Sequence, residues 1–215
     1  MLASDEDSQQ HSRLEPSSTP RVLTILAFVL EKLVVRNDRL VDGVSREQGK
    51  SLDVFHGARP PNISIIKYME RIYKYTNCSP SCFVVGYVYI DRLLHKYPHS
   101  LVVSLNVHRL LVTAVMLAAK MLDDVHYNNA FYARVGGVSN VELNRLEIDL
   151  LFLLNFEMTV HSRVFESYCQ QLEKEMLLNS TTLKIERPMI SNAIDDVTEI
   201  SMEDMPSSSP PQLVD

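Results

Sequence analysis

Three charged residues, Asp91, Lys120 and Glu147, lie within segments of the sequence that are otherwise apolar. Burying an unpaired charge is costly, so each of the three needs an oppositely charged partner or a place at the surface. One interpretation pairs them locally, for example with Arg92 or Arg145, or leaves them in solvent. The other interpretation is that they act together at one binding surface, which requires a fold that brings distant segments side by side.

Other residues that could do chemistry do not form a recognisable metal site. Cys78 and Cys82 could be combined with His95 and His99, but the cysteine spacing differs from that of zinc sites, and Pro98 separates the histidines. We therefore expect no metal. The chain has only three cysteines, which favours reduced thiols and a location in the nucleus or the cytoplasm.

The sequence shows no catalytic or nucleotide-binding motif. Asp123 and Asp124 lie near His126, but adjacent carboxylates at a helix end are usually solvated, and no nucleophile motif accompanies them. Gly136 and Gly137 are not followed by the residues of a phosphate-binding loop. We therefore expect neither an enzyme nor a cofactor.

The segments that carry these residues have the apolar spacing of helices, and none shows the sustained alternation of a strand. The run from Leu110 to Leu122 is apolar nearly all the way round, which is typical of a helix enclosed by others. Ser139 and Glu142 form a capping box, and Gly136 and Gly137 suit the end of the helix before it. The pattern predicts five helices, at residues 64–75, 80–97, 106–122, 128–135 and 139–154.

Further helices are expected on both sides of this five-helix unit. Thr19 is a competent N-cap and Pro20 is favoured at the first helical position, so a helix begins there, and residues 36–38 are expected to end it. Asn106 is expected to cap the central helix, and an amphipathic helix follows the unit at about residues 162–177. The expected fold is all-α: a five-helix bundle around a central apolar helix, with flanking N- and C-terminal helices.

Charge divides the chain into a nearly neutral middle and two acidic ends. Residues 1–20 carry one basic and four acidic residues (−3), residues 21–175 carry 18 and 16 (+2), and residues 176–215 carry 2 and 7 (−5). We assign a disordered N-terminal segment (1–19), an N-terminal helix (20–37), a connecting loop (38–61), the five-helix unit (62–160), a C-terminal helix (161–178) and a disordered acidic tail (179–215). Thr19 and Ser209 each precede a proline and are minimal sites for proline-directed phosphorylation.

The same charge distribution argues against several classes of partner. A middle segment near neutrality has no basic footprint for nucleic acid and no cationic helix for anionic lipid. The apolar stretch from Val22 to Val35 is interrupted by Glu31 and Lys32, and it is shorter than the ~20 residues that cross a bilayer. We therefore expect neither nucleic acid nor a membrane as a partner.

The segments around the three charged residues resemble the cyclin box. Tyr89-Ile-Asp-Arg-Leu93, Leu117-Ala-Ala-Lys-Met-Leu-Asp123 and Leu143-Asn-Arg-Leu-Glu147 look like three of its hallmark segments, and the spacing between them also fits. The fuller sequence, including Asn77 to Cys82 and Asn106 to Leu111, resembles the plant P-type cyclins, also called U-type cyclins. These are relatives of the yeast phosphate-pathway cyclin.

The resemblance covers about residues 20–177 and implies a function. It implies a regulatory subunit that binds and activates a cyclin-dependent kinase, of the A type in plants, in cell division or nutrient signalling. It places Lys120 and Glu147 at the kinase interface. It also gives Asp91 a role as a support of the box from inside.

The sequence departs from the mitotic cyclins at two places. Asn62 stands where those proteins carry an Arg opposite the supporting Asp, which leaves Arg59 and Arg71 as candidate partners of Asp91. The chain has no Trp, so it lacks the Trp-containing patch that recruits substrates in mitotic cyclins. Two other functions stay open: a helical adaptor with no kinase partner, and a cyclin-fold transcription factor that binds DNA.

Overall fold

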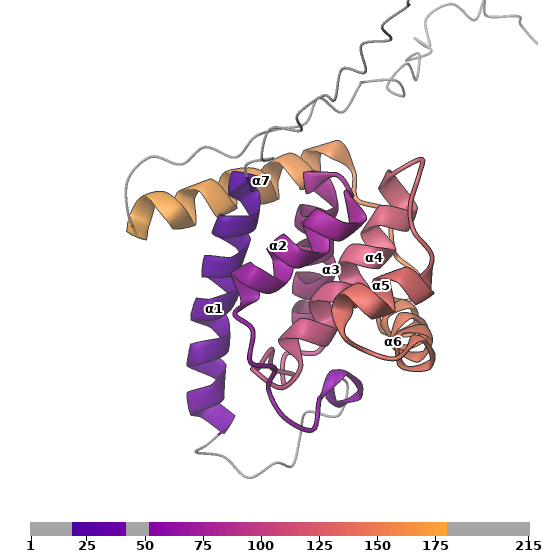
Figure 1. Ribbon diagram of the computed structural model, residues 1–215. Coiled ribbons are helices and arrows are strands. Elements are labelled where there is room, and N and C mark those ends of the chain that lie inside the picture. The colour runs from indigo at the N-terminus through magenta and orange to yellow at the C-terminus, as the bar shows by residue number, and fades with distance from the viewer. Residues whose placement is uncertain (1–18, 42–51, 180–215) are drawn as a thin grey trace, which may run out of the picture.

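The computed structural model describes residues 19–41 and 52–179, and this part of the chain is helical with no strand. Figure 1 shows the arrangement of its helices. In chain order they are α1 (Arg21–Val41), the 3-10 helix η1 (Asp53–Phe55), α2 (Ile65–Thr76), α3 (Pro80–Lys96), α4 (Val107–Leu122), α5 (Asn129–Gly136), α6 (Asn140–Leu153) and α7 (Ser162–Asn179). The predicted all-α fold is confirmed, and the five helices of the unit begin and end within a residue or two of their predicted bounds.

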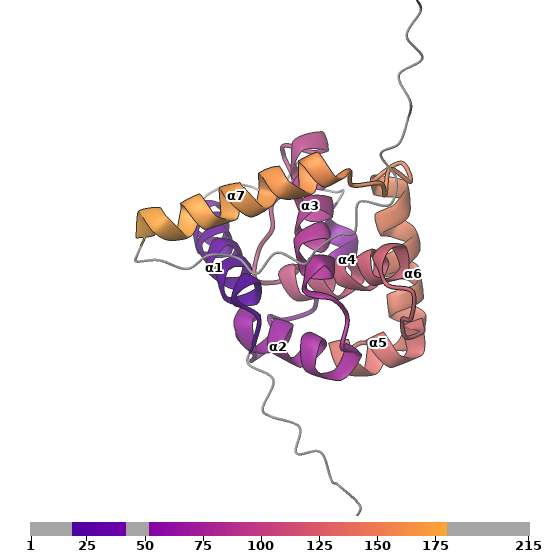
Figure 2. The same cartoon turned by 90° about the horizontal axis from the view of Figure 1, so that it is seen from above.

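The apolar helix α4 is the centre of the structure, as its composition predicts. It packs against α2, α3, α5 and α6, and Figure 2 shows it between these helices from above. Leu117 and Ala118 are buried, as are most residues from Val107 to Ala119. A helix that is apolar on all sides has no face that favours water, so the other helices enclose it.

The two flanking helices cover one side of the five-helix unit. α1 packs against α2 and α3, and α7 packs against α1 and α3, crossing them at the top of Figure 1. α1 buries Leu23, Leu26 and Leu30, and α7 buries Phe165 and Leu172. The flanking helices leave the side formed by α5 and α6 uncovered, as Figure 2 shows.

Helix α1 is longer than predicted, because the residues expected to end it make contacts far away in the sequence. The side-chain amide of Asn37 donates a hydrogen bond of 2.8 Å to the carbonyl of Val102, and the carboxylate of Asp38 accepts one of 3.0 Å from the amide of Ser104. Asn and Asp favour turns when they bond their own local backbone, which these two do not. The helix therefore continues to Val41, so residues 38–41 of the predicted loop are helical.

The capping box at the start of α6 is half formed. The hydroxyl of Ser139 accepts a hydrogen bond of 3.0 Å from the amide of Glu142, as predicted. The carboxylate of Glu142 does not return to Ser139 but pairs with Arg109 on α4 at 2.6 Å. The predicted end of α5 is confirmed, since Gly137 follows it with a φ of 72°, a left-handed conformation that favours glycine.

The carboxylate of Asp123, the residue directly after α4, binds the start of α3. This carboxylate, predicted to be solvated, accepts a hydrogen bond of 3.0 Å from the amide of Ser79 and one of 3.3 Å from the thiol of Cys82. A carboxylate near a helix N-terminus is favourable, so the end of α4 stabilises the start of α3. Asn106 stands at the N-cap position of α4, as predicted, but its side chain makes no capping hydrogen bond to that helix and instead accepts from the amide of Val103 in the preceding loop.

Candidate functional site

Three helices bring the central polar residues together. Lys120 lies in the last turn of α4, Asn129 is the first residue of α5, and Glu147 lies in the middle of α6. α4 packs against both α5 and α6, and α5 packs against α6. The polar side chains therefore meet where the three helices adjoin, at the edge of the apolar core.

The three side chains form a closed hydrogen-bond network. The ammonium nitrogen Nζ of Lys120 donates to Oε1 of Glu147 and to Oδ1 of Asn129, both at 2.6 Å. The amide nitrogen Nδ2 of Asn129 donates to Oε2 of Glu147, also at 2.6 Å. An asparagine amide offers both a donor and an acceptor, so Asn129 joins the cation to the anion without adding charge.

The location of this network is neither the core nor open solvent. The side chain of Lys120 is 28% exposed and that of Glu147 is 16% exposed. The local pairing with Arg145 is wrong for Glu147, because Arg145 faces Asp149, with 3.8 Å between Nε and Oδ2. Lys120 and Glu147 are thus paired with each other and remain accessible from outside.

Sequence reasoning missed Asn129 and its neighbour Asn144. Nδ2 of Asn129 also donates to Oδ1 of Asn144 at 2.8 Å, which extends the network along α6. The sequence pattern places Asn129 only at the start of the predicted helix 128–135. The signal was Asn144, which stands three residues before Glu147 and so lies on the same side of the helix.

Exposed apolar side chains flank the network. Met121 follows Lys120 on α4, and Ile148 follows Glu147 on α6; Met121, Ile148 and Phe152 are each more than half exposed. Ile148 and Phe152 are four residues apart, so they lie on one face of α6. Single exposed apolar residues are common, but a group of them beside a charged network is typical of a binding surface.

Phe156 adds to this group from a strained turn after α6. Its φ is 61°, a left-handed conformation that is costly for a bulky residue, and the preceding Asn155 has a φ of 53°. The ring of Phe156 meets that of Phe152 edge to face, with 5.2 Å between centroids, and it is exposed. We use the term α4–α6 surface for Lys120, Met121, Asn129, Glu147, Ile148, Phe152 and Phe156.

Comparison with known proteins decides the family of the chain. The family model for Cyclin matches residues 4–158, well over half of the sequence. This chain belongs to the cyclin family. Among its curated relatives is Cyclin-U1-1 of Arabidopsis thaliana, which is 69% identical over 175 residues, 80% of this chain and 83% of that protein.

Relatives of both plant types are similar to this cyclin. Cyclin-P3-1 of Oryza sativa subsp. japonica is 50% identical over 178 residues, 83% of this chain and 72% of the relative. Cyclin-U4-1 of Arabidopsis thaliana is 51% identical over 163 residues, 76% of this chain and 80% of the relative. The resemblance to plant P-type and U-type cyclins is confirmed. Cyclins are regulatory subunits rather than enzymes, and their partners are cyclin-dependent kinases.

Asp91 does not support the cyclin box from inside. Its Oδ2 accepts a hydrogen bond of 2.6 Å from the hydroxyl of Tyr168 on α7, and Nδ1 of His95 lies 3.3 Å from the same oxygen. No ion pair joins it to Arg59 or Arg71 in the part of the cyclin that the structure describes. Asp91 lies on the side of α3 that faces α7, so it attaches the flanking helix to the box.

The surroundings of Asp91 shift the pKa values of both partners. Burial raises the pKa of the Tyr168 hydroxyl, and the hydrogen bond to Asp91 raises it further. The hydroxyl therefore remains a donor at neutral pH. A hydrogen bond to the backbone carbonyl of Asp91, followed by the charge of its carboxylate, raises the pKa of His95.

Arg92, the other suggested local partner of Asp91, binds the segment between α6 and α7 instead. Its Nη1 donates to the carbonyl of Glu157 at 2.8 Å and its Nη2 to the carbonyl of Thr159 at 2.9 Å. A guanidinium has several donors in a fixed plane, which suits two carbonyls at once. Arg92 thereby fixes the segment that leads from the α4–α6 surface to α7.

The remaining sites of the sequence prediction lie elsewhere. Thr19 is exposed directly before α1, and Ser209 lies outside the described residues. The thiols of Cys78, Cys82 and Cys169 are buried. Residues 19–41 and 52–179 hold no group of three or more His, Cys, Asp or Glu placed to bind a metal ion. No helix within these ranges is long and apolar enough to span a membrane.

Proposed function

We propose that this cyclin binds and activates a cyclin-dependent kinase through the α4–α6 surface. The observation that carries the proposal is the network of Lys120, Asn129 and Glu147 beside exposed apolar side chains. Charges within an apolar contact favour specificity, because a wrong partner leaves them desolvated and unpaired.

The network retains hydrogen-bonding capacity for a partner. The Lys120 ammonium has three donors and uses two of them on Asn129 and Glu147. Each carboxylate oxygen of Glu147 can accept a further hydrogen bond. The apolar residues around the network would exclude water from such contacts and strengthen them.

A surface without catalytic residues can still activate phosphoryl transfer. Kinase activity requires a lysine on a strand of the kinase to pair with a glutamate on a movable helix. A cyclin that binds this helix in its inward position shifts the kinase toward the active conformation. The cyclin then contributes binding energy, and the kinase contributes the chemistry.

The resemblance to plant cyclins supports a narrower form of the proposal. We infer that the partner is an A-type cyclin-dependent kinase, and that the complex acts in cell division or nutrient signalling, in the nucleus or the cytoplasm.

A charge swap tests the proposal. Purified cyclin is mixed with an A-type plant kinase, and both binding and the rate of substrate phosphorylation are measured. The wild type should bind and activate. The variant with both Lys120→Glu and Glu147→Lys keeps an internal ion pair but presents reversed charges to the kinase. It should weaken binding and activation by more than about tenfold, as expected for charge pairs that an interface desolvates.

A matched control uses the same residue types on another helix. Lys67 and Glu70 on α2 form an ion pair of 2.7 Å, and Lys67→Glu with Glu70→Lys should leave kinase activation unchanged. Full activation by the swapped Lys120 and Glu147 variant would contradict the proposal. Kinase binding without activation would instead favour an adaptor.

A further inference from the structure

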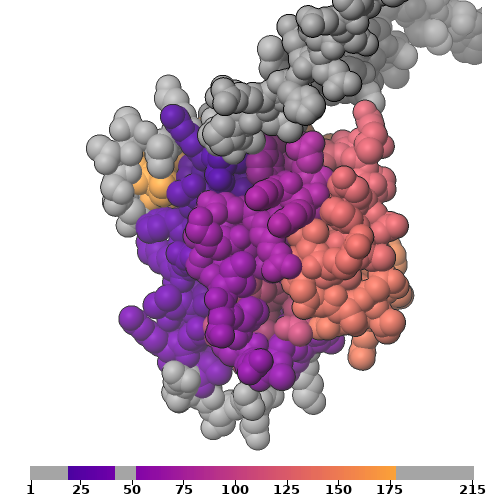
Figure 3. All heavy atoms as spheres, viewed as in Figure 1, coloured from indigo at the N-terminus to yellow at the C-terminus, as the bar shows by residue number. Residues whose placement is uncertain are grey.

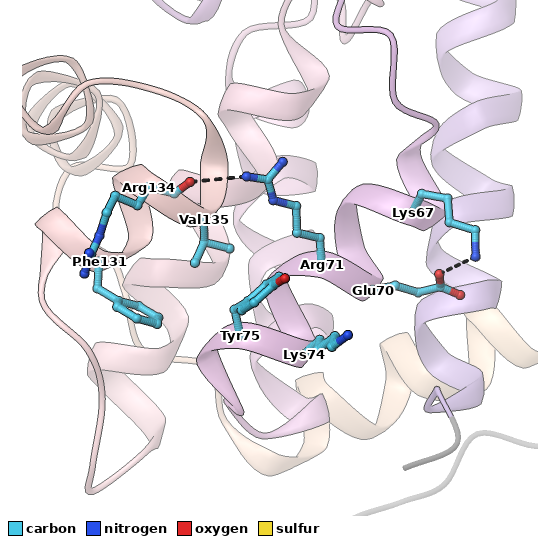
Figure 4. A pocket seen from close by; sticks show the side chains of 8 residues that line it. All are labelled: Lys67, Glu70, Arg71, Lys74, Tyr75, Phe131, Arg134 and Val135. Atoms are coloured by element: carbon cyan, nitrogen blue, oxygen red, sulfur yellow. Dashed lines mark hydrogen bonds and ion pairs between the residues drawn. The ribbon is translucent and has the colours of Figure 1, made fainter. Parts of the chain in front are cut away.

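A second surface of this cyclin is a groove between α2 and α5. Figure 3 shows the side chains of these helices bordering each other on one face of the molecule, and Figure 4 shows the groove closely. Its volume is about 590 Å³. The groove is lined by Lys67, Glu70, Arg71, Lys74, Tyr75, Phe131, Arg134 and Val135.

The groove is positively charged in a chain of net negative charge. Four cations and one carboxylate line it, giving +3, whereas the whole chain carries −6. Lys67 pairs with Glu70. None of the ion pairs found between described residues includes Arg71, Lys74 or Arg134. Arg71 donates one hydrogen bond, of 3.3 Å, to the backbone carbonyl of Arg134, which does not neutralise its charge, so all three cations can still meet an anionic ligand.

The floor of the groove is apolar and partly aromatic. Val135 is buried at its base, Phe131 is half buried, and Tyr75 is 54% exposed. The guanidinium of Arg134 lies 5.5 Å from the centroid of the Phe131 ring. A groove with cationic walls and an apolar floor fits a peptide that alternates acidic and apolar side chains, rather than a small inorganic anion.

We propose that residues 194–205 of this chain occupy the groove. Their sequence is Ile194-Asp-Asp-Val-Thr-Glu-Ile-Ser-Met-Glu-Asp-Met205. It holds five carboxylates and no Lys or Arg, and its apolar residues are interleaved with the acids. The carboxylates complement the three available cations, and the apolar side chains complement the floor. This contact does not depend on the kinase interface.

The chain is long enough to make this contact. Fifteen residues lead from the end of α7 at Asn179 to Ile194, and a chain of that length can span up to about 50 Å. A folded domain of this size has a radius of gyration of about 15 Å, so the segment can reach any face. Tethering also gives an effective concentration in the millimolar range, at which a weak contact is sufficient.

The contact has a consequence for other proteins. An acidic segment of a second protein could enter the groove only by displacing residues 194–205. The tethered segment would thus raise the affinity that a competing segment needs. Deleting the tail would expose the groove and leave the α4–α6 surface unchanged.

Paramagnetic broadening in the full-length cyclin tests the contact. A nitroxide is attached to Cys introduced by Ser201→Cys, while the native thiols of Cys78, Cys82 and Cys169 are buried. At an effective concentration of about 1 mM, a segment that binds the groove with a dissociation constant of about 0.3 mM is bound about three-quarters of the time. The label should then broaden the amide signals of Lys74 and its neighbours in the groove.

Charge reversal in the groove supplies the decisive comparison. Lys74→Glu with Arg134→Glu should weaken the contact about tenfold, which lowers the bound fraction to about a quarter and the broadening about threefold. Lys32→Glu with Arg36→Glu makes the same charge change on α1 and should leave the broadening unchanged. Replacing Asp195, Asp196, Glu203 and Asp204 by Lys should abolish the broadening. Combining these replacements with Lys74→Glu and Arg134→Glu should restore it, because the segment and the groove are then again of opposite charge.

Three results would overturn the proposal. Even broadening over the whole surface would mean that the segment has no preferred site. Equal loss in the α1 control would mean that only net charge matters. Broadening that grows with protein concentration would assign the groove to a second copy of the chain.

Discussion

The ammonium nitrogen of Lys120 lies 2.6 Å from a carboxylate oxygen of Glu147, although the two residues are 27 positions apart in the sequence. Asn129 holds both side chains in place from a third helix. Because the network exists before any partner binds, these side chains need little further ordering on association. Their geometry is therefore a property of the free cyclin.

The first prediction concerns single substitutions in this pair. Lys120→Ala and Glu147→Ala should each weaken kinase binding by well over tenfold, since removing one partner of a desolvated charge pair costs about 2–5 kcal/mol. The melting temperature should change little, because partly exposed ion pairs contribute only about 0–1 kcal/mol to stability. Calorimetric titration and thermal melting measure the two effects. Unfolding of either variant would assign the pair a structural role.

The second prediction concerns Asn129, which acts through the charged pair. Asn129→Ala removes the hydrogen bonds to both Lys120 and Glu147, so these two side chains must be ordered when the kinase binds. Kinase binding should weaken about tenfold, less than for Lys120→Ala. Asn128→Ala is the control, because its side chain only caps α5, accepting from the amide of Phe131. Equal losses in the two variants would trace the effect to α5 itself.

The sequence predicted the elements of this fold because its signals are local. The apolar circumference of α4 identified the central helix, and Gly137 marked the end of α5. These two inferences needed only neighbouring residues. A charge within an apolar run requires a reason, which singles out Lys120, Glu147 and also Asp91. The kinase-interface role of Lys120 and Glu147 comes from the resemblance to the cyclin box.

Sequence reasoning failed where a side chain has a distant partner. Asn37 resembled a helix stop, but its amide binds Val102, 65 positions away. Asp123 resembled a solvated helix end, but it accepts from Ser79 on another helix. Asp91 gave no sign that its partner is a tyrosine beyond the box. Such contacts depend on the tertiary arrangement, which local spacing does not encode.

The third prediction separates stability from binding at Phe156. Glycine adopts a left-handed φ without steric cost, so Phe156→Gly should leave stability unchanged or raise it by about 1 kcal/mol. Removing the exposed ring should weaken kinase binding severalfold, and Phe152→Ala should do the same. Val141→Ala removes another exposed apolar side chain of α6 and serves as the control. If Phe156→Gly bound the kinase more tightly than the wild type, the ring of Phe156 would not belong to the interface.

The fourth prediction concerns the attachment of α7. Tyr168→Phe deletes the hydroxyl that donates to Asp91 and should destabilise the cyclin by about 1–2 kcal/mol, since the acceptor is charged and partly buried. Hydrogen exchange should accelerate in α7 and not in α4. Tyr127→Phe controls for loss of an exposed hydroxyl. Asp91→Asn retains an acceptor and should have a smaller effect.

The fifth prediction is a pH dependence that arises from His108. Its side chain is buried, its Nε2 lies 2.9 Å from the carbonyl of Ile63, and burial lowers its pKa. The neutral ring donates from Nε2 and packs edge to face on Tyr68, with 4.9 Å between centroids. Protonation would place an uncompensated charge on the second ring nitrogen, which has no partner among the described residues.

The sign of the effect follows from proton linkage. An unfolded histidine has a pKa of about 6.5, so below that pH the unfolded chain binds a proton that folded His108 resists. Stability should therefore be complete above about pH 6.5 and decline as the pH falls toward 5. His95, whose pKa is raised, contributes in the opposite direction, so the comparison must be with a variant. His108→Gln retains a donor for the carbonyl of Ile63 and should lose less stability than the wild type between pH 7.5 and 5.5. Urea unfolding at the two pH values measures this difference in the free energy of unfolding. An equally steep decline in His108→Gln would place the titrating group elsewhere.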